Sequence, residues 1–258
     1  MKKVIVFFAA LGCALTVATQ LFGQDVPVWS DEFNYAGQPD SSKWTKIVAA
    51  KGAVNNELQR YVTDDANCFV DGQYLHIKAI GGGDGITSAR LVTRHKGDWL
   101  YGRMEARIKL PGGRGTWPAF WMMPSESAYG RWPRSGEIDI MENVGFAKDT
   151  IYGTVHTYAY NHTINTQKGK NIRIDGVEDG FHVYSCRWTP REIEISVDGK
   201  KYFTFENDMA GNSDTWPFDK PFHIILNLAI GGDWGGQKGI APGLLPCEMI
   251  VDWVRVYK

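Results

Sequence analysis

The chain has 258 residues and a formal net charge of -1, from 28 Lys and Arg against 29 Asp and Glu. With 43% hydrophobic and 22% charged residues, its composition is that of a folded globular protein and not of a disordered one. The balanced charge, without any basic run, argues against electrostatic binding of nucleic acid or of an anionic membrane. The 10 Trp and 29 Gly residues indicate turn-rich β-structure with flat surfaces for a ligand.

Residues 1–24 have the pattern of a signal peptide. A basic start precedes an uncharged, mostly apolar stretch from Val4 to Phe22, and a polar chain follows. A transmembrane anchor is one alternative, because the stretch approaches the ~20 residues that span a bilayer. A lipid anchor on Cys13 is another, although the preceding residues resemble the bacterial attachment motif only weakly. We expect a secreted or periplasmic protein with one domain over 25–258.

The mature chain contains short strand-like runs separated by Gly, Pro, Asn and Asp. Tyr74–Lys78 follows an Asp71-Gly72 turn, and Arg103–Leu110 alternates charged with apolar side chains. This alternation is typical of a strand that has one face on a core and the other in water. No amphipathic helix of three or more turns is evident, so the pattern favours an all-β fold.

The most informative run reads Glu-Ile-Asp-Ile-Met-Glu and places three carboxylates among apolar residues. In a regular strand, Glu137 and Asp139 share a face, whereas Glu142 points to the other face. One extra residue, accommodated as a β-bulge near Ile140-Met141, would return Glu142 to the first face. The three carboxylates would then lie along one wall over roughly 13 Å, at ~3.3 Å per residue.

Such a cluster costs free energy through repulsion between like charges, so at least one of its pKa values should rise. A glycosidase needs this arrangement, because one carboxyl has to be protonated and another ionised at neutral pH. A solvated acidic edge strand is the alternative. The apolar residues between the acids and the nearby tryptophans favour the catalytic interpretation.

Tryptophans near this run offer flat surfaces to the apolar C–H faces of sugar rings, since an indole presents ~150–250 Å². The candidates are Trp117, Trp121 and Trp132 beside the carboxylates and Trp234 in the glycine-rich loop 231–236. Packing in the core is the alternative for each of them.

The later strands predict how the sheets are arranged. Glu192–Val197 alternates and enters Asp198-Gly199, which is a strong hairpin signal. Phe222–Ile230 and Met249–Tyr257 are longer and apolar on both faces. Strands covered on both faces imply two stacked sheets, so the sequence predicts one β-sandwich domain.

By its spacing, Asp252 shares a strand face with Ile250, Val254 and Val256. An ionised carboxylate in such a place is costly unless it has a partner. An arginine is one possible partner, and a calcium ion, which prefers oxygen ligands, is the other.

The mature chain keeps three cysteines, Cys68, Cys186 and Cys247, so at most one disulfide can form within it. Their spacing matches no zinc motif. We interpret all three as small core residues, with a single disulfide as the alternative.

Glu-Ile-Asp-Ile-Met-Glu resembles the signature of glycoside hydrolase family 16, in the bulged form of its laminarinase-like members. Other stretches resemble that family in the expected order: Trp29–Phe33, Asn55–Tyr61, Gly115–Met122, Trp132-Pro133, His156, Asn227–Gly232 and Val251–Tyr257. The resemblance covers essentially the whole mature chain. It implies a β-jelly-roll sandwich of two antiparallel sheets with a concave substrate cleft, and retaining endo-hydrolysis of a β-glucan.

The resemblance also implies roles for single residues. Glu137 matches the nucleophile, Glu142 the acid/base, and Asp139 the residue that assists the nucleophile. Trp132 matches a platform on the non-reducing side of the scissile bond, and His156 a residue near the leaving group. The residues that match positions binding distal sugars are Asn55, Glu57 and Arg90. This chemistry requires no metal or organic cofactor.

Many members of the family hold a structural calcium ion on their convex side, away from the cleft. The matching ligands here would be Glu32, the Gly72 carbonyl and Asp252. The resemblance implies a β-glucan polysaccharide or oligosaccharide as the partner and no protein partner, so we expect a monomer.

We therefore expect a secreted endo-β-1,3-glucanase that also cuts mixed-linkage β-1,3/1,4-glucan. The alternatives within the enzyme class are a lichenase restricted to mixed-linkage glucan and an algal galactan hydrolase. A non-catalytic glucan-binding lectin on the same fold is the alternative of another class, although a lectin has no need of a repulsive acid cluster.

Overall fold

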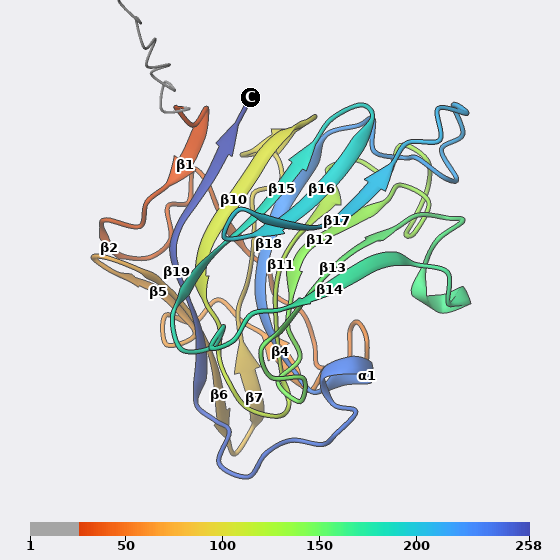
Figure 1. The fold of residues 1–258 in the computed structure, drawn as a ribbon. Coiled ribbons are helices and arrows are strands. Elements are labelled where there is room, and N and C mark those ends of the chain that lie inside the picture. Colours follow the sequence, from red (N-terminus) through yellow and green to blue (C-terminus); the bar gives the residue numbers. More distant parts are fainter. Residues whose placement is uncertain (1–25) are drawn as a thin grey trace, which may run out of the picture.

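The computed structural model describes residues 26–258, so the predicted signal peptide and Cys13 lie outside the described residues. Two β-sheets pack face to face as a sandwich (Figure 1), which confirms the predicted all-β class and two-sheet architecture. The helical elements of the described part are the short turns η1 (His162–Ile164) and α1 (Gly232–Gly235). Within this part, no helix is long and apolar enough to cross a membrane.

Eleven strands form the first sheet. Its spatial order is β17 (Lys200–Glu206), β16 (Glu192–Val197), β15 (Phe181–Trp188), β10 (Gly102–Lys109), β19 (Cys247–Tyr257), β6 (Leu75–Gly82), β5 (Cys68–Asp71) and β2 (Ala36–Gly37). The strands outside this path are β1 (Trp29–Asp31), which pairs with β19, β7 (Gly85–Ser88), which pairs with β6, and β4 (Gln59–Tyr61), which pairs with β7. All these pairings are antiparallel except that of β4 with β7, which is parallel.

Eight strands form the second sheet, which carries the cleft described below. Its spatial order is β14 (Lys168–Arg173), β13 (Thr150–His156), β12 (Glu137–Glu142), β11 (Thr116–Pro124), β18 (Phe222–Ile230), β8 (Arg90–Val92) and β3 (Thr45–Lys46). The remaining strand, β9 (Asp98–Trp99), pairs with β18. Strands distant in sequence, such as β11 and β18, thus lie side by side at the centre of the sheet.

The predicted period-2 patterns are present where the sequence places them. Met104, Ala106 and Ile108 of β10 are fully buried, while the charged residues between them face outward. The β16–β17 hairpin turns at Asp198 and Gly199, which have φ of 50° and 74°. A two-residue turn with both φ values positive matches the twist of its strands, which explains the Asp-Gly sequence.

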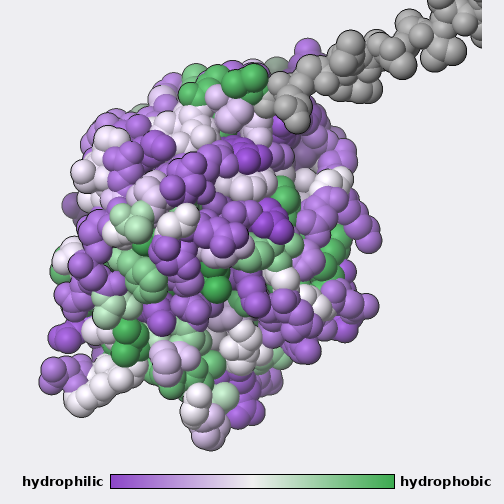
Figure 2. All heavy atoms as spheres, turned by 90° about the vertical axis from the view of Figure 1, so that its left-hand side faces the viewer, coloured by the Kyte–Doolittle hydropathy of each residue, from purple (hydrophilic) through white to green (hydrophobic). Residues whose placement is uncertain are grey.

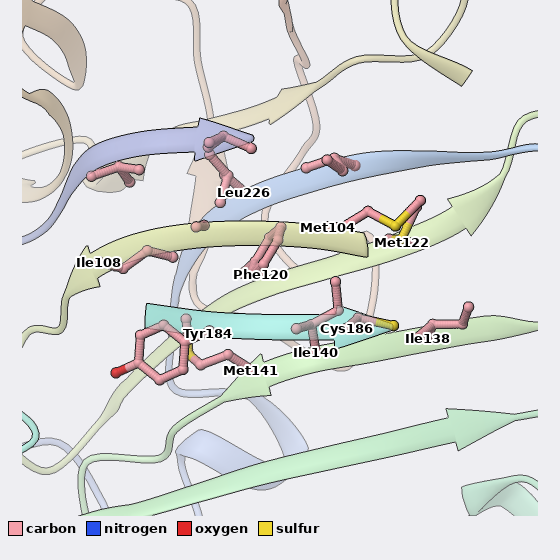
Figure 3. Packing of buried hydrophobic residues seen from close by; sticks show 14 of the residues in the cluster. Met104, Ile108, Phe120, Met122, Ile138, Ile140, Met141, Tyr184, Cys186 and Leu226 are labelled. Atoms are coloured by element: carbon pink, nitrogen blue, oxygen red, sulfur yellow. The ribbon is translucent and has the colours of Figure 1, made fainter. Parts of the chain in front are cut away.

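The core fills the space between the two sheets (Figure 3). Met104 and Cys186 come from the first sheet, and Phe120, Ile140 and Leu226 from the second; all are fully buried. The three cysteines of the described residues are free thiols: Cys68 and Cys186 are buried in the core, as predicted, whereas Cys247 is partly exposed. The outer side formed by β1, β2 and β19 is mainly hydrophilic (Figure 2), as expected for the solvent face of a sandwich.

The two long apolar strands, β18 and β19, were predicted to be covered by protein on both faces, and neither is. Every residue of β18 is buried, but His223, Ile225 and Asn227 line the cleft floor and are not covered by a third layer. In β19 only one face is buried, and the pairing with β10 shifts at Arg107/Ile108, which makes Asp252 an extra residue. Val251 and Val254 both face inward as a result, and Asp252 does not share their face.

Candidate active site

The carboxylate strand β12 is bulged where the sequence predicts. Asp139 pairs with Trp121 on β11, but the next pair joins Met141 to Phe120, so Ile140 is the extra residue. Pairing with β13 on the other side is interrupted over the same residues. The apolar residues of the strand are fully buried in the core (Figure 3), whereas its three carboxylates line one cleft. The bulge thereby places Glu142 on the same face as Asp139.

The cleft has a volume of about 1150 Å³ and crosses the second sheet from β8 to β14. The structure brings all the residues predicted to bind substrate to this cleft, namely Asn55, Glu57, Arg90, Trp117, Trp121, Trp132, His156 and Trp234. They come from six separate parts of the chain. The cleft extends on both sides of the carboxylates, which is the shape required to bind the interior of a polymer.

Each of the two glutamates accepts a hydrogen bond from an indole. Trp132 Nε1 donates to Glu137 Oε2 at 2.8 Å, and Trp117 Nε1 donates to Glu142 Oε1 at 2.9 Å. His156 Nε2 lies 3.4 Å from Asp139 Oδ2 and 3.8 Å from Glu137 Oε1. These contacts fix the orientation of carboxyl groups that otherwise repel one another.

Burial and mutual repulsion raise the pKa of all three carboxyl groups. Burial, with the charge of Asp139, raises the pKa of Glu137 to about 8, while the indole of Trp132 and the charge of His156 oppose the rise. Burial is also the main cause for Glu142, whose pKa rises to about 7. The pKa of Asp139 is raised well above its usual range by burial and by Glu142. The cluster therefore retains at least one proton near neutral pH, as an acid catalyst requires.

Asp139→Asn is expected to stabilise the protein while lowering its activity. A folded-state pKa above the unfolded value means that the carboxyl destabilises the fold once pH exceeds its ordinary pKa. The gain in stability should therefore be small near pH 4 and larger near pH 8, with Tm rising about 2–4 °C for each ~1 kcal/mol of repulsion relieved. Thermal melts of both proteins across this pH range test it, and a gain that shrinks as pH rises would contradict it.

On one side of the carboxylates, a polar network surrounds Arg90. Its guanidinium lies over the rings of Tyr61 and Trp121, 4.5 and 5.6 Å from their centroids. Glu57, which is 5% exposed, accepts hydrogen bonds from Gln59 and from the Tyr61 hydroxyl. Arg90 and the ring of Trp121 thus form one wall of the cleft, held by planar polar groups.

Sequence reasoning missed Tyr61 and Asn227 as parts of this wall. Trp121 Nε1 donates to Asn227 Oδ1 at 2.7 Å, and Asn227 Nδ2 donates to the Tyr61 hydroxyl at 3.2 Å. A lone amide in the apolar run of β18 is the signal that could have revealed Asn227, since a buried polar group needs partners.

Other aromatic rings of the cleft contact one another. Trp234 contacts Trp117 and Tyr152, with ring centroids 5.6 and 4.9 Å apart. His162 lies 5.0 Å from the ring of Trp132, and its pKa is lowered by burial and by His156. Tyr152 and His162 were not predicted from the sequence, because neither stands in a run that marks it as part of a site.

The residues predicted as calcium ligands do not fit a calcium site. The Asp252 carboxylate is paired with Arg107, and both oxygens of Glu32 accept hydrogen bonds from Arg255, at 3.0 and 2.7 Å. Carboxylates committed to guanidinium groups are not free to ligate a cation. For Asp252, the arginine alternative therefore describes the structure, and the buried strand face assumed for it is wrong because of the bulge in β19.

Elsewhere in the described residues, ligand atoms of Glu137, Asp139 and His156 lie within 4.8 Å of one another, which is close enough for a metal ion. All three already belong to the carboxyl cluster of the cleft or contact it.

Paired acid groups on one wall of a long cleft, one able to attack and one able to donate a proton, define a β-sandwich glycoside hydrolase.

Comparisons with known proteins also identify a glycoside hydrolase. The model of the glycosyl hydrolases family 16 matches residues 53–255. A beta-glucanase from Rhodothermus marinus is 50% identical over 241 residues, which cover 90% of this chain and 84% of the relative. The solved laminarinase from R. marinus has a TM-score of 0.88 at 49% identity, covering 91% of this chain and 98% of its own. The chain belongs to glycoside hydrolase family 16.

A second solved structure carries a glucan oligosaccharide. It is a mutant of SCLam, a non-specific endo-β-1,3(4)-glucanase of the same family, co-crystallised with 1,3-β-D-cellotriosyl-glucose. Its TM-score is 0.87 at 44% identity, with 92% of this chain and 95% of that chain covered. The similarity thus extends over nearly the full length of a family member with sugar at its active site.

Proposed function

We propose that this protein is a secreted, retaining endo-β-1,3-glucanase that also hydrolyses mixed-linkage β-1,3/1,4-glucan. The observation that carries the proposal is the bulged strand, which brings three buried carboxyl groups to the floor of one cleft. The relatives named a laminarinase and a non-specific endo-β-1,3(4)-glucanase support the substrate class. An open cleft lined on both sides of the carboxylates favours attack within a chain.

The first half of the reaction forms a glycosyl-enzyme. Glu137, oriented by the Trp132 indole, attacks the anomeric carbon as its carboxylate. Glu142 donates its proton to the departing glycosidic oxygen, so the leaving sugar departs as a neutral alcohol. Asp139 is buried between the two glutamates and keeps its own proton, because its pKa is raised well above the usual range. A neutral Asp139 adds no negative charge beside the Glu137 carboxylate.

The second half releases the sugar. Glu142, now ionised, takes a proton from water, and the resulting hydroxide attacks the anomeric carbon from the side that the leaving group vacated. Glu137 departs as a carboxylate and the anomeric configuration is retained. Glu142 regains the proton that it gave up, so the cycle closes without another reactant.

Digestion of laminarin, mixed-linkage glucan and agarose tests the proposal, with linkage analysis of the products and NMR of the anomer first released. We expect β-anomers from laminarin and from mixed-linkage glucan, and no cleavage of agarose. Glu137→Gln, prepared identically, controls for contaminating hydrolases. Binding of laminarin without cleavage would establish the lectin alternative, and α-anomers would exclude double displacement.

Secretion rests on the sequence pattern of residues 1–24. We infer that this segment is removed on export and that the mature enzyme acts outside the cytoplasm, where polymeric glucans are found. Mass spectrometry of the protein recovered from a native or heterologous culture would give the first residue of the mature chain. A mature chain that begins with a lipid-modified Cys13 would establish the anchored alternative.

A further inference from the structure

We propose that Trp117 is a positioning residue for the acid/base, acting through its indole N–H on Glu142 and not through its ring face on a sugar. The inference rests on the proposed function, because it concerns the proton that Glu142 gives and takes. The distance of 2.9 Å between Trp117 Nε1 and Glu142 Oε1 is that of a good hydrogen bond. The indole edge of Trp117 is therefore committed to the acid/base.

The turn α1 packs against one part of the Trp117 side chain, which otherwise lines the cleft. Trp234 meets it edge to face at an interplanar angle of 80°. A side-chain carbon added at Gly235 would lie 2.9 Å from Trp117 Cβ, and one added at Gly232 would lie 3.3 Å from Trp117 Cζ3. Glycine is required at these positions because the backbone itself packs against the indole. The ring is held in place, and its N–H edge is left pointing at the carboxyl group.

The turn α1 is anchored in its own right. The backbone N–H of Asp233 donates to the Asn55 carbonyl at 2.8 Å, and Asn56 Nδ2 donates to Asp233 Oδ1 at the same distance. The loop that supplies Asn55 to one part of the cleft thereby also supports the indole beside the acid/base. This support explains how a single hydrogen bond can keep its geometry through a catalytic cycle.

The hydrogen bond favours the ionised form of Glu142, because an N–H donor stabilises a carboxylate more than a carboxylic acid. Burial acts in the opposite direction. The titratable groups that interact with Glu142 are Glu137 and Asp139 on its own strand, His156 on β13 and Tyr202 on β17. Tyr152 on β13 pairs with Glu142 across the sheet, and Lys170 on β14 and Asp233 in α1 line the same cleft. Trp117 thus keeps a buried acid able to lose its proton, which the second half of the reaction requires.

Trp117→Phe tests the inference against Trp121→Phe, which removes an indole N–H that donates to an amide in the same cleft. Carboxyl carbons of ¹³C-labelled glutamate are titrated by NMR, with Glu142 identified by its loss in Glu142→Gln. We expect the Glu142 midpoint to rise by about one pH unit in Trp117→Phe and to stay unchanged in Trp121→Phe. An unchanged midpoint in folded Trp117→Phe overturns the inference.

Kinetics on laminarin add a readout that a sugar platform would not move. We expect Trp117→Phe to lower kcat about tenfold with little change in KM, whereas loss of a platform raises KM. If the variant does not fold, benzothienylalanine at position 117 keeps the ring and removes only the N–H. The titration does not depend on turnover, so an inactive wild-type protein would refute the proposed function and leave this inference to be decided by the NMR result.

Discussion

Glu137→Ala is expected to stop turnover of β-glucan, while Glu142→Ala should still release the aglycone of an activated aryl glucoside. Without Glu137 no glycosyl-enzyme can form. Without Glu142 a polymer lacks its proton donor, but a good leaving group departs unprotonated. Polymer activity should fall by several orders of magnitude in both variants. Reducing-sugar release and aryl release, measured in parallel, separate the two roles.

Azide should rescue the two variants with opposite stereochemistry. In Glu142→Ala it attacks the glycosyl-enzyme and gives the β-azide, with retention. In Glu137→Ala it occupies the space of the lost carboxylate and gives the α-azide, with inversion. Glu57→Ala is the matched control, because Glu57 is another buried carboxylate of the cleft that lies in the Arg90 network. The reverse assignment of azides would exchange the roles of Glu137 and Glu142.

Met141→Pro is expected to be the most destabilising single change in the carboxylate strand. Met141 is fully buried beside Ile140, the extra residue of the bulge, and pairs with Phe120. Proline removes a backbone donor and fixes φ, and the lost side chain leaves a cavity, so the free energy of unfolding should fall by roughly 3 kcal/mol or more. Met141→Leu, which conserves volume, should cost less than about 1.5 kcal/mol. Denaturant unfolding of both variants gives the difference.

Deletion of Met141 tests whether the bulge is needed for activity. The deletion shortens the strand by one residue and leaves regular alternation, in which Glu142 still shares a face with Asp139. We expect the folded deletion variant to keep activity, since all three carboxylates stay on one face of the strand. A folded but inactive variant would show that the bulge itself sets the position of the acid/base.

Much of the fold was predictable because it depends on local rules. The alternation in Arg103–Leu110 and Glu192–Val197 and the turn at Asp198-Gly199 follow from strand periodicity and from the backbone angles that a tight turn requires. The bulge in β12 was predictable for the same reason. Only one extra residue could place three carboxylates on one face while keeping the apolar residues in the core.

The outward position of Asp252 was not predictable in this way. It depends on a second bulge, in β19, whose apolar residues fit either face, and on Arg107, which lies 145 residues away in sequence. An apolar run contains no information about where its pairing shifts, because that is decided by the neighbouring strand. The family resemblance implied a calcium site at Glu32, Gly72 and Asp252, and arginines pair with both of these carboxylates.

By itself, the sequence determined the strands, the face that carries Glu137, Asp139 and Glu142, and the family. The strands and this face depend on spacing along a few consecutive residues, and the family depends on several short stretches in order along the chain. Only the tertiary structure decided that the Trp117 indole points at Glu142, that Asn227 joins Tyr61 to Trp121, and that β18 forms a cleft floor. These are contacts between side chains of strands distant in sequence, and their partners are set by sheet register and by packing, which no local pattern encodes.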